Sequence, residues 1–140
     1  MKRVLFIYIC IAVGLLACSQ SPDDQLVHLE GYWEIADVTT PEGQTKTFSI
    51  SQNIDFFDIG ANSKGIRKKV QPSISGKFTT SKSSENIDIT IIDGELILTY
   101  TTPLDSWKET VIKATQDELI LLNENGNTYS YRRYEPLVIK

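Results

Sequence analysis

The stretch IDITIIDGELILTY, residues 87–100, decides the fold, because it predicts a β-hairpin together with its register. Asp93 and Gly94 stand between two runs that alternate apolar and polar residues, which is a strong signal for a two-residue turn. With these two residues as the loop, six apolar residues share one face: Ile87, Ile89, Ile91, Leu96, Leu98 and Tyr100. The opposite face carries Asp88, Thr90, Glu95 and Thr99. A one-residue slip would mix the faces, so the register is specified.

The rest of the chain after residue 26 also has strand character, with turn signals about every ten residues. Predicted strands cover residues 31–38, 53–58, 65–70, 75–80, 86–92, 95–101, 107–114, 118–122 and 128–134. A further short strand lies in TKTFSI, residues 45–50, and one helical turn in DDQLVHLE, residues 23–30. Short antiparallel strands in this number form a barrel or a sandwich. Tight hairpins and the lack of a long crossover favour an all-β, antiparallel up-and-down barrel of 8–10 strands, with a β-sandwich as the alternative.

A second hairpin is predicted at Asn125-Gly126, where Leu122 would pair with Tyr129 and Ile120 with Tyr131. The opposite face would then carry Leu119, Leu121, Ser130 and Arg132. Both faces of ELILL, residues 118–122, are apolar, so the pattern does not choose the inner one.

The N-terminus has the form of a secretory signal peptide. Lys2 and Arg3 precede 14 uncharged residues, 4–17, which as a helix would reach about 21 Å against a hydrocarbon core of about 30 Å. A membrane-spanning helix is therefore the weaker interpretation. Without Lys2 and Arg3, 12 basic and 18 acidic residues remain, a net charge of −6. This balance argues against a nucleic-acid partner, which would require a basic face.

The leader ends in LLAC, residues 15–18, which resembles the lipobox of bacterial lipoproteins. The resemblance implies cleavage before Cys18 and acylation of its thiol, and Cys10 would leave with the leader, so no disulfide remains. Ser19 in place of Asp resembles the sorting signal for the outer membrane, and SQSPDDQ, residues 19–25, resembles short acidic signals for surface display. Which side of that membrane the protein faces stays open. The expected organisation is a signal peptide at 1–17, an acylated tether at 18–28 and one barrel domain at 29–140.

LEGYWEI, residues 29–35, resembles the first strand of the lipocalin-like lipoproteins of Gram-negative bacteria, with Gly31-x-Trp33 as its G-x-W. Later segments fit the same family: GKFTTS from residue 76, LILTYTT from 96, WKET from 107 and TYSYRRYE from 128. The resemblance implies that Trp33 packs under an Arg of the last strand, Arg132 or Arg133, and so closes the barrel. A guanidinium over an indole contributes about 0.5–2 kcal/mol. The chain is shorter than a typical lipocalin, which argues against a large pocket.

Catalytic chemistry is not indicated. His28 is the one histidine, and with no free Cys it cannot assemble a zinc site; no nucleophile–base pair is present either. The candidate acids are Glu34, Asp105 and Glu109, and Glu109 lies two residues from Trp107, where a buried acid would mark a site. A carboxylate on a strand is more commonly solvated or paired with a cation. We expect a protein without catalysis, cofactor or metal.

Arg132-x-Tyr134 resembles the pair that holds a carboxylate in fatty-acid-binding barrels, provided that the face with Leu119, Leu121 and Arg132 points inward. The aromatic residues would line a cavity or fill it. The candidate ligand-binding residues are Phe56, Phe78, Tyr100, Trp107, Tyr131, Arg132 and Tyr134. The expected function is a barrel anchored in the outer membrane that binds a small apolar or amphipathic ligand. The alternative is a filled barrel that serves as a protein-interaction or accessory subunit of an envelope complex, and an envelope enzyme is a third, weaker possibility.

Overall fold

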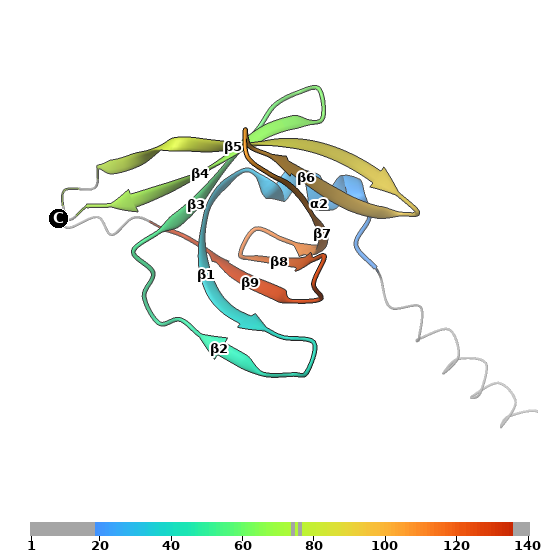
Figure 1. Ribbon diagram of the computed structural model, residues 1–140, viewed down its shortest axis with the longest axis horizontal. Coiled ribbons are helices and arrows are strands. Elements are labelled where there is room, and N and C mark those ends of the chain that lie inside the picture. Colours follow the sequence, from blue (N-terminus) through green and yellow to red (C-terminus); the bar gives the residue numbers. More distant parts are fainter. Residues whose placement is uncertain (1–18, 74, 76, 136–140) are drawn as a thin grey trace, which may run out of the picture.

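The computed structural model describes residues 19–73, 75 and 77–135, and within them the chain forms one helix and nine strands (Figure 1). The elements are α2 (Pro22–Leu29), β1 (Gly31–Thr39), β2 (Thr45–Thr47), β3 (Ile54–Ile59), β4 (Lys64–Pro72), β5 (Phe78–Ile92), β6 (Glu95–Thr101), β7 (Ser106–Ala114), β8 (Glu118–Asn123) and β9 (Thr128–Arg133). Neighbouring strands are antiparallel in the order β2-β1-β3-β4-β5-β6-β7-β8-β9, and β1 also pairs with β9. This pairing closes eight strands into an antiparallel barrel, with β2 attached to β1 outside it. The predicted barrel is confirmed over the sandwich. The leader and Cys18 lie outside the described residues.

The hairpin between β5 and β6 has the predicted register: Ile91 faces Leu96, and Ile87 faces Tyr100. Asp93 and Gly94 adopt φ of +52° and +79°, the left-handed conformation that such a turn requires. Five of the six residues expected on the inner face are buried. The sixth, Ile91, is 53% exposed, because the tip of the hairpin extends beyond the end of the barrel (Figure 1).

Strand β5 differs from its prediction, because one strand of 15 residues, Phe78–Ile92, stands where two strands, 75–80 and 86–92, were expected. The polar run SKSSEN, residues 81–86, resembled a break. It remains in the sheet because it pairs with β4, whose own register shifts at a bulge between Lys68 and Val70. The predicted short strand and helical turn are present as β2 and the two-turn α2.

The register predicted for the second hairpin is wrong by one residue. Leu121 faces Tyr129 and Leu119 faces Tyr131, so these apolar residues share the inner face. The loop has three residues, because the Asn123 amide donates to the Asn127 carbonyl at 3.0 Å and Gly126 takes φ of +82°. Asn123 Oδ1 further accepts from the amides of Asn125 and Asn127. The shift carries Arg132 to the outer face.

Helix α2 covers one end of the barrel, the end where β1 begins and β9 ends, and this end is called the closed end below. Ser21 caps the helix by accepting from the Asp24 amide at 3.2 Å. Leu29 is fully buried in the core, and Gln25 Nε2 donates to the carbonyls of Val111 and Ile112 at 3.2 and 3.3 Å. Before the helix, the Gln20 side chain hydrogen-bonds both backbone groups of Ala114 at the end of β7. The segment expected as a tether is thus fixed to the barrel from Gln20 onward.

Candidate binding site

Trp33 and Arg133 join the first and last strands at the closed end. Trp33 is fully buried, the Arg133 guanidinium carbon lies 3.7 Å from the centre of its ring, and the indole Nε1 donates to the Leu29 carbonyl at 2.9 Å. Arg133 also donates to the carbonyls of Glu30 at 2.7 Å and His28 at 2.9 Å. The question of which arginine lies on Trp33 is answered by this geometry: it is Arg133. The pair has a structural role, because all its partners are groups of the closed end.

Gly31 explains why the G-x-W motif starts with a glycine. Its φ is +119°, a backbone conformation that other residues adopt only with strain. A Cβ on this residue would also lie 2.7 Å from Arg133 Nη1. Glycine is therefore required for the arginine to reach both the indole of Trp33 and the Glu30 carbonyl.

Arg132 lies on the outer face of the barrel. Its Nε donates to Glu34 Oε2 at 2.9 Å, and its Nη2 donates to the Ser49 carbonyl at 3.1 Å. Glu34 Oε1 in turn accepts from the Ser51 amide at 3.1 Å. Arg132 and Glu34 thus fasten the segment between β2 and β3 to the barrel wall, and they are not brought to the interior.

Three of the candidate ligand-binding aromatics, Phe56, Phe78 and Tyr134, lie on the same outer wall. Together with Tyr32 they form a group that we call the outer aromatic cluster. Trp33 and Phe57 point inward, so their neighbours Tyr32 and Phe56 point outward. Tyr32 stacks on Phe56 at 4.6 Å and on Phe78 at 4.8 Å between ring centres, and Tyr134 meets Phe78 edge-on at 6.1 Å.

The interior is apolar near the closed end and charged toward the open end. Arg67 on β4 points inward beside Phe57, is 8% exposed, and lies with its guanidinium carbon 4.1 Å from the centre of the Tyr100 ring. It forms an ion pair with Glu85 on β5, and its Nη1 lies 3.5 Å from Glu109 Oε2 on β7. One buried cation is therefore shared by two carboxylates. We call Arg67, Glu85, Glu109 and Tyr100 the interior polar cluster.

Two atoms of this cluster are buried with unused hydrogen-bonding capacity. The Tyr100 hydroxyl and Glu109 Oε2 lie close to each other, but neither makes a hydrogen bond of good geometry among the described residues, and Glu109 Oε2 has only the ion pair with Arg67. Burial raises the pKa of Glu109, although the charge of Arg67 and the Tyr100 hydroxyl oppose the shift. Burial also raises the pKa of Tyr100 well above its ordinary value, so its hydroxyl stays neutral. Unsatisfied buried polar groups are costly and mark a place where a ligand or water completes the site.

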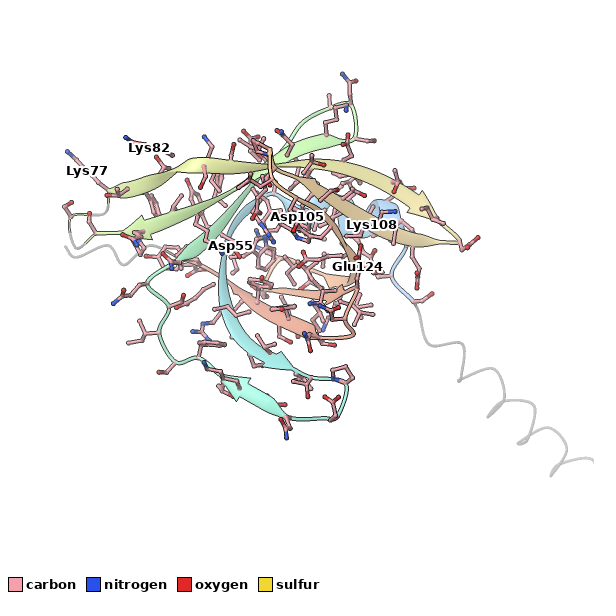
Figure 2. The ribbon with its side chains drawn as sticks, in the orientation of Figure 1. Asp55, Lys77, Lys82, Asp105, Lys108 and Glu124 are labelled. Carbon is pink, nitrogen blue, oxygen red and sulfur yellow. The ribbon has the colours of Figure 1, made fainter. Side chains whose placement is uncertain are left out.

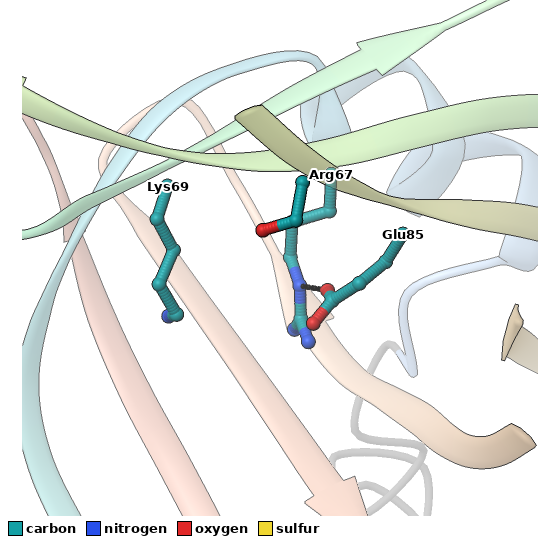
Figure 3. Close-up of a pocket in the computed structure, with 4 residues that line it drawn as sticks. Arg67, Lys69 and Glu85 are labelled. Atoms are coloured by element: carbon teal, nitrogen blue, oxygen red, sulfur yellow. Dashed lines mark hydrogen bonds and ion pairs between the residues drawn. The ribbon is translucent and has the colours of Figure 1, made fainter. Parts of the chain in front are cut away.

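A cavity of about 150 Å³ adjoins the cluster, lined by Arg67, Lys69, Ser83 and Glu85. Figure 3 shows Arg67 and Glu85 directed toward each other, with Lys69 beside them. Lys69 is more than half exposed and pairs with the buried Asp55 at 2.9 Å. Lys77 and Lys82, at the far end of β5, extend away from the barrel (Figure 2). The cavity is thus small, charged and reached from solvent.

The predicted site residues are divided between the two faces of the wall. Tyr100 and Tyr131 lie in the interior, and Trp107 stacks on Tyr100 at 5.5 Å. Glu109 is buried and pairs with Arg67, and a pair with a cation was one of the two common states expected for a carboxylate on a strand. Sequence reasoning missed Arg67 and Glu85. The alternation in β4 would place its apolar residues, Ile66 and Val70, on the inner face and Arg67 on the outer one. In the structure Ile66 and Val70 lie on the outer face.

In the described part of the chain no helix is long and apolar enough to cross a membrane. Among the same residues, no three His, Cys, Asp or Glu side chains are grouped in a way that could hold a metal ion.

Comparisons with known proteins find similar chains among solved structures only. No protein-family model and no curated protein matches the chain. Among solved structures, the chain is similar to a lipocalin-like protein from Bacteroides uniformis, with 12% identity and a TM-score of 0.49 over 76% of this chain and 99% of that one. It is also similar to an uncharacterized protein from Bacteroides eggerthii, with 14% identity and a TM-score of 0.48 over 75% and 98%. At these identities the similarity concerns the fold alone.

Proposed function

We propose that this protein is a lipoprotein of the outer membrane whose barrel binds a small amphipathic molecule through its open end, without catalysis. The observation that carries the proposal is a pair of buried polar atoms without a hydrogen bond, Tyr100 Oη and Glu109 Oε2, beside Arg67 and Glu85, which line a cavity. A protein that only needed a filled barrel would be more stable with apolar side chains at these positions.

The charges of the interior polar cluster favour a hydroxyl or amino group on the ligand over a carboxylate. Arg67 already faces two carboxylates, Glu85 and Glu109, so a third anion would meet net negative charge. Glu109 Oε2 requires a donor, and the Tyr100 hydroxyl donates or accepts. The cavity of about 150 Å³ lies below the roughly 300–1,000 Å³ of sites for drug-sized ligands. It therefore admits a polar head group, while the apolar part of the ligand remains near Trp107 and the open end.

A set of ten-carbon probes tests this site. Purified protein freed of lipid and detergent is titrated with 1-decanol, decylamine and decanoate, and complexes are measured by native mass spectrometry and calorimetry. We expect saturable binding of the alcohol or the amine and weaker binding of the acid. Tyr100→Phe should weaken binding by about three- to tenfold, the equivalent of one hydrogen bond.

The matched control is Tyr32→Phe, which removes a hydroxyl from the outer aromatic cluster and should leave binding unchanged. Binding of decanoate in preference to the other two probes would contradict the assignment of the head group. Failure of all three probes to bind would contradict the binding function itself.

The second candidate function, a protein-interaction or accessory subunit of an envelope complex, is favoured by the outer aromatic cluster. Its four rings lie on the outer wall and each is only partly buried. Aromatic residues are enriched at protein interfaces. Under this alternative the three probes fail to bind, and replacing Phe56 by Ser weakens the complex with the partner.

Membrane attachment is tested at Cys18, which lies outside the described residues. Each buried methylene of an acyl chain contributes about 0.8 kcal/mol, so the loss of all chains releases the protein. We expect Cys18→Ser to abolish incorporation of a labelled fatty acid and to remove the protein from the membrane fraction. Cys10→Ser, within the leader, should keep both properties. Attachment that persists in Cys18→Ser would refute the lipid anchor.

A further inference from the structure

Exposed apolar side chains are concentrated at the closed end of the barrel. Among residues 19–73, 75 and 77–135, six large hydrophobic residues are largely exposed, and four of these lie at this end: Val27, Ile91, Ile92 and Ile112. We call these four the end patch. Of the other two, Leu104 lies in the β6–β7 connection at the open end and is 96% exposed, and Ile50 lies in the β2–β3 segment on the outer wall.

Three members of the end patch lie on strands that only β6 separates: Ile91 and Ile92 end β5 and point to its two opposite faces, and Ile112 lies on β7. Ile91 faces Leu96 across β5 and β6, and Leu96 faces Val111 across β6 and β7. Adjacent strands lie about 4.8 Å apart, so Ile91 and Val111 are separated by only about 10 Å. Helix α2 is fixed to the same place, because Gln25 donates to the carbonyls of Val111 and Ile112.

Val27 is directed away from the barrel. Gln25 and Leu29 are the buried residues of α2, and a residue between them in sequence points to the opposite side of the helix. Val27 is accordingly 74% exposed. The end patch therefore forms the outermost surface of the closed end, from the helix to the tip of the β5–β6 hairpin, which lies on the same side of the molecule as the start of α2 (Figure 1).

The preceding chain leads directly to this surface. Gln20 is bonded to the backbone of Ala114, so Cys18 lies two residues from a fixed point of the closed end. Two residues span at most about 7 Å. An acyl chain on Cys18 must therefore start within this distance of Gln20, and an apolar segment that ends at residue 17 must end within about 11 Å of it.

We propose that the end patch lies against the lipid surface, so that the open end with its cavity faces away from the membrane. The charges nearby indicate a zwitterionic lipid surface over an anionic one. Asp23 and Asp24 in α2 and Asp93 and Glu95 in the hairpin are acidic, and Lys113 is paired with Glu118 at 2.6 Å. The inference rests on the membrane attachment proposed above but is independent of any ligand.

Spin labels measure this orientation. The full-length lipidated protein is reconstituted in phosphatidylcholine vesicles with a nitroxide at Val27→Cys, Ile92→Cys or Leu104→Cys, and wild-type protein treated in parallel gives the background. All three side chains are exposed, so the substitutions leave the core intact. We expect the labels at positions 27 and 92 to collide several-fold less with an aqueous nickel chelate, and more with oxygen, than the label at position 104.

Vesicle flotation separates the two ways in which the inference can fail. Protein that floats with the vesicles while all three labels are equally accessible to the chelate overturns the orientation and leaves the attachment standing. Protection at position 104 in place of 27 and 92 shows that the barrel is inverted. Protein that does not float with the vesicles overturns the attachment and the orientation with it.

Discussion

Replacing Trp33 by Ala should lower the free energy of unfolding by about 3–5 kcal/mol, the usual cost of truncating a fully buried Trp. The indole fills the closed end under Arg133, and its Nε1 bonds the Leu29 carbonyl at 2.9 Å. Truncation therefore leaves a cavity, an unpartnered carbonyl and a guanidinium without its aromatic partner. Because whole domains are stable by only about 5–15 kcal/mol, the loss should be evident in urea unfolding followed by circular dichroism.

The second tryptophan is the matched control for this measurement. Trp107 is only partly buried and stacks on Tyr100 near the open end, so Trp107→Ala should cost less than half as much. If Trp33→Ala fails to fold, Trp33→Phe still tests the idea, because it keeps a ring under Arg133 and removes the hydrogen bond. Equal effects of the two alanine substitutions would contradict the closing role of Trp33.

The two hairpins show when a sequence specifies its register. In the β5–β6 hairpin, polar Asp88 and Thr90 separate the isoleucines, so only one register places all apolar residues on one side. In β8 the run from Leu119 to Leu122 is apolar on both faces, so a one-residue slip still places apolar residues on the inner face. The three-residue loop after Asn123 decided the register there, through side-chain hydrogen bonds that the Asn-Gly pair alone did not indicate.

The interior polar cluster was harder to predict than the barrel, because its members are far apart in sequence and their strands lack a regular apolar pattern. Glu109 stood out beside Trp107, but its partner Arg67 lies 42 residues earlier, in the basic run IRKK. A buried arginine there is distinguished from its exposed neighbours only by the carboxylates that the closed barrel places opposite it. Closure of the sheet thus brings the interior polar cluster together, and no local sequence pattern predicts it.

The two ends of the barrel differ in how their polar groups are bonded. The closed end has its polar groups bonded to one another, as in Arg133 with the carbonyls of His28 and Glu30, and it is built for stability. Toward the open end, buried polar atoms of Tyr100 and Glu109 lack a hydrogen bond, at some cost to the fold. This difference is the physical reason for assigning binding to the open end.

Arg67→Met should lower the free energy of unfolding by about 3–5 kcal/mol near pH 8, although methionine is similar in length and suits an apolar interior. The side chain of Glu109 is 8% exposed and would keep no cation within its reach in the interior polar cluster. Lys64→Met, on the same strand, removes a cation from the exposed pair with Asp88 and should cost less than about 1 kcal/mol. Chemical unfolding of the two variants and the wild type at several pH values provides the comparison.

The pH dependence distinguishes lost charge from lost packing. Burial already holds the pKa of folded Glu109 above its ordinary value of 4.5, and without Arg67 the pKa rises further. A carboxyl with a raised pKa in the folded state binds its proton more tightly there than in the unfolded chain, so stability decreases as the pH rises above about 4.5. The deficit of Arg67→Met should therefore be small near pH 4.5 and grow toward pH 8.

Adding Glu109→Gln should remove most of this slope, because the amide cannot ionise. A deficit that is constant with pH would show that Arg67 acts through its packing on Tyr100, 4.1 Å away, and that its charge does not hold the cluster together.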